Sequence, residues 1–319
     1  MEIRKDFLSL AVPDITSAEK KEVMEALDSG WISVGPKVRE FEKQFAEYHN
    51  VKHAVSTSSC TTALFLAAKV LGIGKGDYVI IPTITWQSTA NIVEQLDATP
   101  LFCDVNRDTL NIKAEDVENY IRQYGEKVKA IIPVHHSGLP ADIDKFTEIS
   151  QSHNIPLIYD AAHAVFSSYD NKPVGQFGDM SCFSFYATKN LTTGDGGMIT
   201  TNNDELAELC RIWSYHGLPK DSWKRYSAEN ASPHVQCVVP GYKFNLTDMQ
   251  AALGLAQMKR KEELLAKRNE LVEYYNDLFK DTDWIQRPVF KTEKGQYGNH
   301  VYVIKIIDED VDRDILMQE

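Results

Sequence analysis

Lys189 stands where a reactive amine would be expected. It lies in the stretch FSFYATKN (183–190), just after an alternating, partly aromatic run, and the glycine-rich stretch GDGG (194–197) follows closely. Partial burial at the end of a strand lowers the pKa of a lysine below its free value of about 10.4. Such an amine is a nucleophile that can form a Schiff base with a carbonyl compound. The alternative is a surface lysine that happens to follow a strand.

Asp160 and His163 form a second candidate group, in the run YDAAH (159–163). A carboxylate that ends an apolar strand is costly to bury without a partner, and a protonated ring nitrogen would be such a partner. His163 could reach the same ligand. The ordinary alternatives are a helix N-cap for Asp160 and a hydrogen-bonded histidine. No metal is predicted, because the pair has no third ligand nearby.

Two further features follow predicted strands. The turn Ser58-Ser59-Cys60-Thr61 precedes a predicted helix, whose free N–H groups and dipole suit a phosphate, although an ordinary N-cap is the alternative. Trp86, in ITWQS (84–88), could stack on a flat ring or belong to the core. With Ser184 and Lys189, these features match a phosphate, an aromatic ring, a basic ring nitrogen and an aldehyde, which together describe pyridoxal phosphate.

The elements that must position these residues alternate between strands and helices. Continuous apolar strands between helical patterns predict an α/β fold with a largely parallel sheet covered on both faces, and ligands bind at the carboxyl ends of such strands. The predicted helices cover 16–28, 37–49, 61–72, 114–124 and 141–153. The predicted strands are YVIIPTITW (78–86), TPLFCDV (99–105), KAIIPVHH (129–136), IPLIYDAA (155–162) and MSCFSFYA (180–187).

The C-terminal part of the chain has a different pattern. A capping box at Thr247 predicts a helix that continues to about Lys280 and bridges two domains. The alternating run VYVIKII (301–307) predicts a strand of a smaller α+β region. The chain ends within DVDRDILMQE, which reads as the first turns of another helix. We therefore expect an incomplete small domain and a truncated C-terminus.

Composition limits the possible partners. The formal net charge of −12 disfavours nucleic acid and anionic membranes, and no apolar run is long enough to span a bilayer. The N-terminus has no apolar signal core. The five scattered cysteines suit a reducing cytoplasm better than a disulfide framework.

The sequence resembles the DegT/DnrJ/EryC1/StrS family of pyridoxal-phosphate-dependent nucleotide-sugar aminotransferases. The resemblance covers nearly the whole chain. It rests on SGWISVGPKVREFE (29–42), VSTSSCTTALFLA (55–67), PTITWQSTANIV (82–93), IPVHHSGLPADID (132–144), YDAAHAVFSSY (159–169), FSFYATKNLTTGDGGMITT (183–201) and PGYKFNLTDMQAALGLAQM (240–258). SGWISVGPK, TWQSTANIV, HGLPKDSW and GYKFNLTD are most similar to the branch that makes UDP-4-amino-4-deoxy-L-arabinose.

The resemblance implies the fold and the domains. It implies a fold-type I transferase with a large cofactor-binding domain over 1–250, built on a mostly parallel seven-stranded sheet between helices. Residues 251–319 would form the bridging helix and part of the small domain.

The resemblance also implies a role for each candidate residue. Lys189 would carry the cofactor as a Schiff base and move the proton, and Asp160 would keep the ring nitrogen protonated. Trp86 would stack on the ring, with His163 beside it. The phosphate would be held by Ser59, Cys60 and Ser184, the first two largely through backbone amides.

A residue of the neighbouring subunit would complete the phosphate site, so the active unit would be a homodimer. Many relatives read G-Y-N-Y-R in the segment concerned, whereas this chain has Lys243 and Asn245 at the Asn and Arg positions. Asn245 is the predicted contact.

The implied reaction is a ping-pong transamination. L-glutamate would convert the cofactor to pyridoxamine phosphate, which would aminate a keto-sugar linked to a nucleoside diphosphate. A 4-keto sugar for a cell-surface polysaccharide or glycan is predicted. The alternatives are another pyridoxal phosphate reaction (a dehydratase, a lyase or sulfur transfer), a non-catalytic cofactor-binding regulator, and a structural ion pair between Lys189 and Asp160. The family's dehydratases have His at the lysine position, so Lys189 favours transamination.

Overall fold

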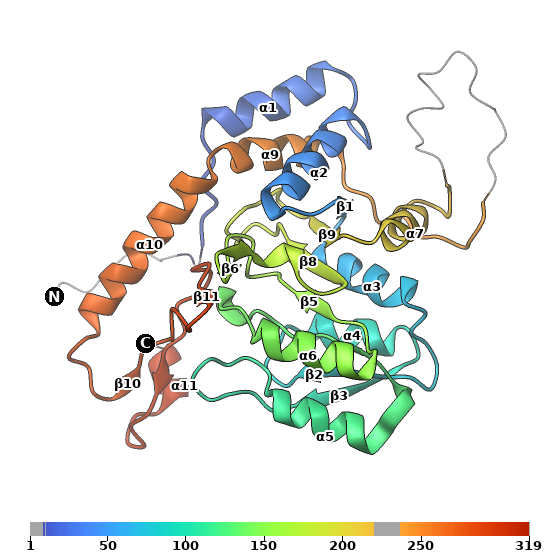
Figure 1. The fold of residues 1–319 in the computed structure, drawn as a ribbon. Helices are drawn as coiled ribbons and strands as arrows, with labels where there is room; N and C mark the ends of the chain where they lie inside the picture. Colours follow the sequence, from blue (N-terminus) through green and yellow to red (C-terminus); the bar gives the residue numbers. More distant parts are fainter. Residues whose placement is uncertain (1–8, 10, 220–236, 319) are drawn as a thin grey trace, which may run out of the picture.

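The computed structural model describes residues 9, 11–219 and 237–318. Within this part, seven strands form one layer in the order β3-β2-β4-β5-β8-β9-β1 (Figure 1). Isolated parallel bridges, Ile131 to Leu157 and Val134 to Asp160, join β4 to β5. Neighbouring strands are parallel except around β9, which is antiparallel to β8 and β1. The strands are β1 (His53–Thr57), β2 (Tyr78–Pro82), β3 (Thr99–Cys103), β4 (Val128–Ile131), β5 (Ile158–Asp160), β8 (Met180–Ser184) and β9 (Gly197–Thr201).

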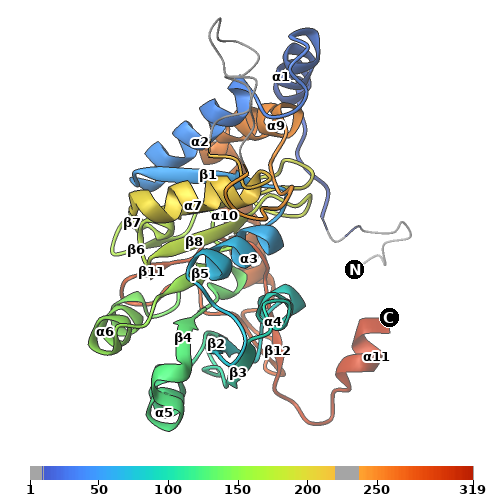
Figure 2. The same cartoon turned by 90° about the vertical axis from the view of Figure 1, so that its right-hand side faces the viewer.

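Successive side chains of a strand point to opposite faces of the sheet, and an apolar cluster covers each face. Ile80 of β2 belongs to one apolar cluster, whereas its neighbours Val79 and Ile81 belong to the other. Figure 2 shows the layer with helices on both sides. The first cluster is covered by α2 (Pro36–His49), α5 (Ala114–Tyr124), α6 (Ile143–His153) and α9 (Asp248–Lys259). The second is covered by α3 (Cys60–Val70), α4 (Gln87–Glu94) and α7 (Asp204–Ser214). The predicted mostly parallel seven-stranded α/β fold is confirmed.

Local sequence signals fix where several helices begin. Thr16 closes a capping box with Glu19 at the start of α1 (Ser17–Asp28), and Thr247 does the same with Gln250 at the start of α9. Both helix starts are confirmed. The prediction of one helix continuing to about Lys280 is wrong, because Arg260 leaves the helical conformation (φ −105°, ψ 11°) and divides α9 from α10 (Lys261–Leu278).

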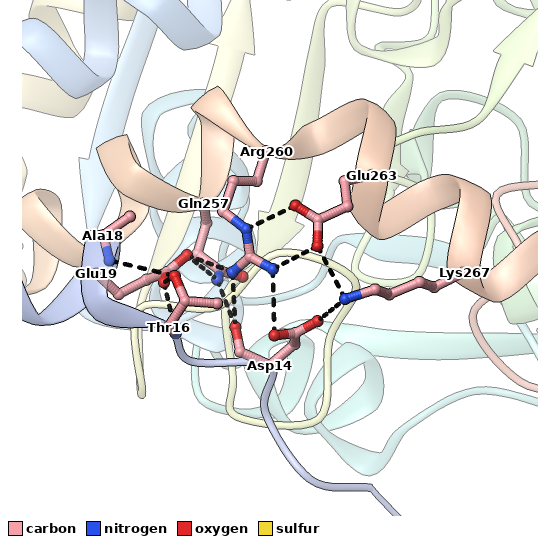
Figure 3. A network of polar contacts seen from close by, with 8 residues as sticks. All are labelled: Asp14, Thr16, Ala18, Glu19, Gln257, Arg260, Glu263 and Lys267. Atoms are coloured by element: carbon pink, nitrogen blue, oxygen red, sulfur yellow. Dashed lines mark hydrogen bonds and ion pairs between the residues drawn. The ribbon is translucent and has the colours of Figure 1, made fainter.

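A network of charged side chains holds the chain at this break (Figure 3). Arg260 donates to Glu19 of α1 at 2.8 Å, to the Asp14 side chain at 3.2 Å and to Glu263 of α10 at 2.8 Å. Lys267 adds ion pairs to Asp14 and Glu263. The network joins the N-terminal segment to the junction at which α10 begins (Figure 1).

After α10 the chain forms short strands. The predicted strand over 301–307 is wrong in extent, because only Lys305–Ile306 pairs, as β12, with β10 (Ile285–Gln286). β11 (Gly295–Gln296) pairs with β6 (Ser168–Tyr169), which also pairs with β7 (Lys172–Pro173). The last helix is α11 (Arg313–Gln318). β11 thus packs against β6, which comes from the part of the chain between β5 and β8. The division of the chain after residue 250 stays a prediction.

No helix in the described ranges is both long enough and apolar enough to cross a membrane. Residues 220–223 of the HGLPKDSW segment lie outside the described residues.

Candidate active site

Lys189 lies in the turn that follows β8. The strand ends at Ser184, and the Lys189 N–H donates to the Tyr186 carbonyl at 2.9 Å. Burial lowers the pKa of the Lys189 amine, although Cys60 and the Asp160 charge act in the opposite direction. Lys189 therefore lies within electrostatic reach of Asp160, and a larger fraction of its amine is neutral than for a free lysine.

Asp160 ends β5 at the centre of the sheet, with 3% of its surface exposed. Its Oδ2 accepts a hydrogen bond from the Thr89 hydroxyl at 3.0 Å, and its Oδ1 accepts from the Ala162 N–H at 3.1 Å. Burial raises the pKa of this carboxyl, while the two hydrogen bonds and the Lys189 charge oppose the rise. A carboxylate held in this way would be stabilised by a cation at the strand end.

Thr89 was not identified from the sequence. It is fully buried on α4, and its hydroxyl also lies 2.7 Å from the Thr85 hydroxyl. The available signal was its place three residues after Trp86, on the face of the helix that meets the strand ends. Its contact with Asp160 joins residues 71 positions apart, which spacing along the sequence does not reveal.

The Ser59 turn forms the N-terminus of α3. The Ser59 hydroxyl caps the helix by accepting from the Thr62 N–H at 3.2 Å, and the Ser59 N–H donates to Thr62 Oγ1 at 3.1 Å. The N-cap alternative therefore holds for this side chain, and the Ser59 amide already has a partner. The Cys60 amide opens the helix, where N–H groups have no intrahelical acceptor, so it suits an anion better.

The glycine-rich stretch has a packing role beside this turn. A Cβ atom on Gly197 would lie 2.4 Å from the Ser59 carbonyl oxygen and 2.7 Å from the Cys60 nitrogen. Glycine is needed because β9 passes directly against the start of α3. Ser184, the last residue of β8, pairs with Gly197 and therefore lies at the same end of the sheet as the start of α3. Its hydroxyl accepts from the Tyr186 N–H at 3.4 Å.

Trp86 and Asn245 are the two remaining candidate residues. Trp86 is the N-cap of α4 and is 73% exposed, which leaves its ring open to a ligand. Asn245 accepts from the Lys243 ammonium and donates to the Leu246 carbonyl at 3.0 Å. Its contribution to the site of a neighbouring subunit stays a prediction.

His163 lies close to Lys189 and is joined there by His300, which sequence reasoning missed. Its Nδ1 accepts from the Ser137 N–H at 3.2 Å, so the neutral ring carries its hydrogen on Nε2. Burial, with the nearby Lys189 charge, lowers the pKa of His163 to about 3. The His163 and His300 ring centres are 4.4 Å apart.

These residues fit pyridoxal phosphate. The buried Asp160 carboxyl suits a protonated ring nitrogen, a lysine with a lowered pKa suits an aldehyde, and the α3 N-terminus suits a phosphate. Among the described residues, no cluster of three or more His, Cys, Asp or Glu side chains could hold a metal ion. The fold is that of the fold-type I, pyridoxal-phosphate-dependent transferases.

Comparison with known proteins identifies the family. The sequence model of the DegT/DnrJ/EryC1/StrS aminotransferase family matches residues 13–319, and the chain belongs to this family. It is 44% identical over 303 residues to the spore coat polysaccharide biosynthesis protein SpsC of Bacillus subtilis, covering 95% of this chain and 77% of that protein. The family depends on pyridoxal phosphate, so the chain is a pyridoxal-phosphate-dependent aminotransferase.

Solved structures agree with this membership. The Spr1654 protein of Streptococcus pneumoniae, assigned as a sugar aminotransferase, is 33% identical in its pyridoxamine-phosphate form, with a TM-score of 0.89 over 98% of this chain and 82% of that chain. Its pyridoxal-phosphate form matches with a TM-score of 0.87 at 32% identity, over 98% of this chain and 81% of that chain. Helicobacter pylori PseC, an aminotransferase of pseudoaminic acid biosynthesis, has a TM-score of 0.84 at 30% identity over 93% of this chain and 77% of that chain.

Proposed function

We propose that this aminotransferase moves an amino group from L-glutamate to a keto-sugar linked to a nucleoside diphosphate. A 4-keto sugar destined for a cell-surface polysaccharide or glycan is the proposed acceptor. The sequence segments shared with the UDP-4-amino-4-deoxy-L-arabinose branch support the 4-keto position. The role of SpsC in spore coat polysaccharide biosynthesis supports the destination. The observation that carries the proposal is the half-buried Lys189 in the turn after β8, within electrostatic reach of the buried Asp160 carboxyl at the end of β5.

Lys189 is the proposed base. Bound pyridoxal phosphate supplies an aldehyde that binds amines and a ring that withdraws electrons. Because burial lowers the pKa of Lys189, its amine is free to accept a proton more often than a surface lysine at neutral pH. It takes the proton from the α-carbon of the amino donor and returns one to the sugar carbon that receives the amino group.

Asp160, Thr89 and the helix start are the proposed binding groups. The Asp160 carboxylate binds the protonated ring nitrogen, and the Thr89 hydroxyl fixes the orientation of that carboxylate. The Cys60 amide and Ser184 bind the phosphate, Trp86 covers one face of the ring, and His163 lies beside it.

We also propose that two copies form the active unit, with Asn245 of one copy completing the phosphate site of the other. Asn245 is half-buried, and its hydrogen bonds to Lys243 and Leu246 support a fixed position for its side chain. Sedimentation at micromolar protein concentration tests whether the protein is a dimer. A cytoplasmic location is proposed because all five cysteines are free thiols.

Absorbance with defined substrates tests the reaction. The protein is loaded with pyridoxal phosphate, mixed with L-glutamate, and assayed for loss of the visible band and release of 2-oxoglutarate. UDP-, GDP- and dTDP-linked 4-keto sugars are then tested as acceptors. Lys189→Ala should abolish turnover, whereas Lys172→Ala, at an exposed position of β7, should leave it unchanged.

The two parts of the proposal fail in different ways. A visible band that L-glutamate leaves unchanged, while another amino acid removes it, would refute the donor. Conversion of a 3-keto but not a 4-keto sugar would refute the acceptor. Turnover by Lys189→Ala at the wild-type rate would refute the role of the lysine.

A further inference from the structure

A segment from the far end of the chain enters the site. Gly298 N–H donates to the Gly138 carbonyl at 2.9 Å, and His300 N–H donates to the Ser137 carbonyl at 3.2 Å. Gly138 has a φ of +101°, and a Cβ atom there would lie 2.9 Å from the His163 carbonyl oxygen. The turn at Gly138 therefore lies close to the backbone of both His163 and Gly298. This arrangement brings the His300 side chain to the ring of His163.

Asn190 fastens this segment next to Lys189. Its side chain is 5% exposed, its Nδ2 donates to the Gly298 carbonyl, and its Oδ1 lies 3.0 Å from His300 Nδ1. If the Asn190 amide were turned by 180°, its oxygen would face the Gly298 carbonyl oxygen, and neither could donate a hydrogen. The Gly298 carbonyl therefore fixes the orientation of the Asn190 amide. Because Oδ1 can only accept, His300 Nδ1 must carry the hydrogen.

The surroundings keep His300 neutral. Burial lowers its pKa, and the nearby charges of Lys189 and Arg268 lower it further. Arg268, on α10, donates to the His300 carbonyl at 3.1 Å. His136 lies on the far side of His163, with 6.4 Å between the ring centres of His136 and His163. In the described part of the chain, no donor contacts His300 Nε2. This nitrogen is therefore a lone-pair acceptor at neutral pH.

We propose that His300 is a positioning residue of the active site, held by Asn190 as the Nδ1–H tautomer so that its Nε2 accepts a hydrogen bond from an amine. The amine belongs either to Lys189, once that side chain is free, or to the amino donor. The inference rests on the proposed role of Lys189. It assigns to the region after α10 a direct part in the chemistry at β8.

The tautomer is tested on the wild-type chain. Protein labelled with ¹⁵N-histidine is examined by NMR in its pyridoxamine-phosphate form, in which Lys189 is free. The His300 signals are assigned by their loss in His300→Asn. A hydrogen on Nδ1 is expected, and a hydrogen on Nε2 would overturn the proposal. This measurement needs neither turnover nor a known sugar, so it is independent of the proposed substrates.

Two variants at the same position separate the two amines. His300→Asn can keep the donor to Asn190 but removes the acceptor at Nε2, whereas His300→Gln can place an amide oxygen there. His153→Asn, at an exposed position at the end of α6, is the control. The readouts are the pH midpoint of Lys189 labelling by an amine reagent, followed by mass spectrometry, and the KM and kcat for L-glutamate.

The outcomes are distinct. If Lys189 is the partner, its labelling midpoint falls by about one pH unit in His300→Asn, because a bond to the ammonium is lost. If the amino donor is the partner, the midpoint is unchanged and the KM for L-glutamate rises about tenfold with kcat retained. His300→Gln should restore whichever value moved. An unchanged midpoint together with an unchanged KM in His300→Asn would overturn the proposal.

Discussion

Glu19→Gln should destabilise the protein strongly at neutral pH and clearly less at pH 3. The Glu19 side chain is fully buried. One carboxylate oxygen accepts from the Thr16 N–H at 2.7 Å, and the other accepts from Arg260 at 2.8 Å and Gln257 at 2.9 Å (Figure 3). A glutamine amide keeps one acceptor and turns an N–H group toward donors on the other side, so at least one buried hydrogen bond is lost.

The size of the effect follows from the pKa of Glu19. Burial alone would raise it, but the hydrogen bonds from Thr16 and Arg260 outweigh burial and lower it from 4.5 to about 2. A lowered native pKa means that the stabilisation is present above pH 4.5 and is lost as the pH falls toward 2. The difference of 2.5 units corresponds to about 3 kcal/mol in the free energy of unfolding at pH 7.

Urea unfolding at several pH values measures this effect. The midpoints for wild type and Glu19→Gln are compared from pH 7 down to pH 3, using far-UV circular dichroism. Glu263→Gln is the matched control, because Glu263 accepts from the same Arg260 guanidinium but is half exposed and should matter much less. A loss below about 1 kcal/mol at pH 7, or one that does not shrink in acid, would refute the reasoning.

Three further predictions concern the site. Thr89→Val removes the 3.0 Å hydrogen bond to Asp160 and should weaken pyridoxal phosphate binding about five- to tenfold, measured by equilibrium titration; unchanged affinity would contradict the orienting role. Asp160→Asn should retain some cofactor but slow the glutamate half-reaction by about a hundredfold or more in stopped-flow absorbance, and near-normal kinetics would remove Asp160 from its role. Gly197→Ala should cost about 1–3 kcal/mol and reduce cofactor content, because its Cβ would meet the Ser59 carbonyl oxygen. Gly74→Ala, whose Cβ would meet nothing closer than 3.9 Å, should be tolerated, and equal costs for the two would contradict this account.

Much of the fold follows from local sequence patterns. Apolar strands that alternate with helices predicted the parallel sheet, because both faces of such a sheet must be covered. The capping boxes at Thr16 and Thr247 located two helix starts, because the hydrogen bonds of a capping box join residues only three positions apart. The break at Arg260 was missed, because it depends on partners as distant as Asp14.

For the site, the sequence by itself determined which residue types stand at strand ends: Lys189 after β8, Asp160 at the end of β5, and the Ser59 turn before α3. Only the tertiary structure decided their partners. The bonds of Asp160 to Thr89, of Asn190 to His300, and the contact of Gly197 with Ser59 each join segments far apart in the chain. Hydrogen bonds and steric contacts act over a few ångströms in space, so spacing along the chain encodes them only where the contact is local.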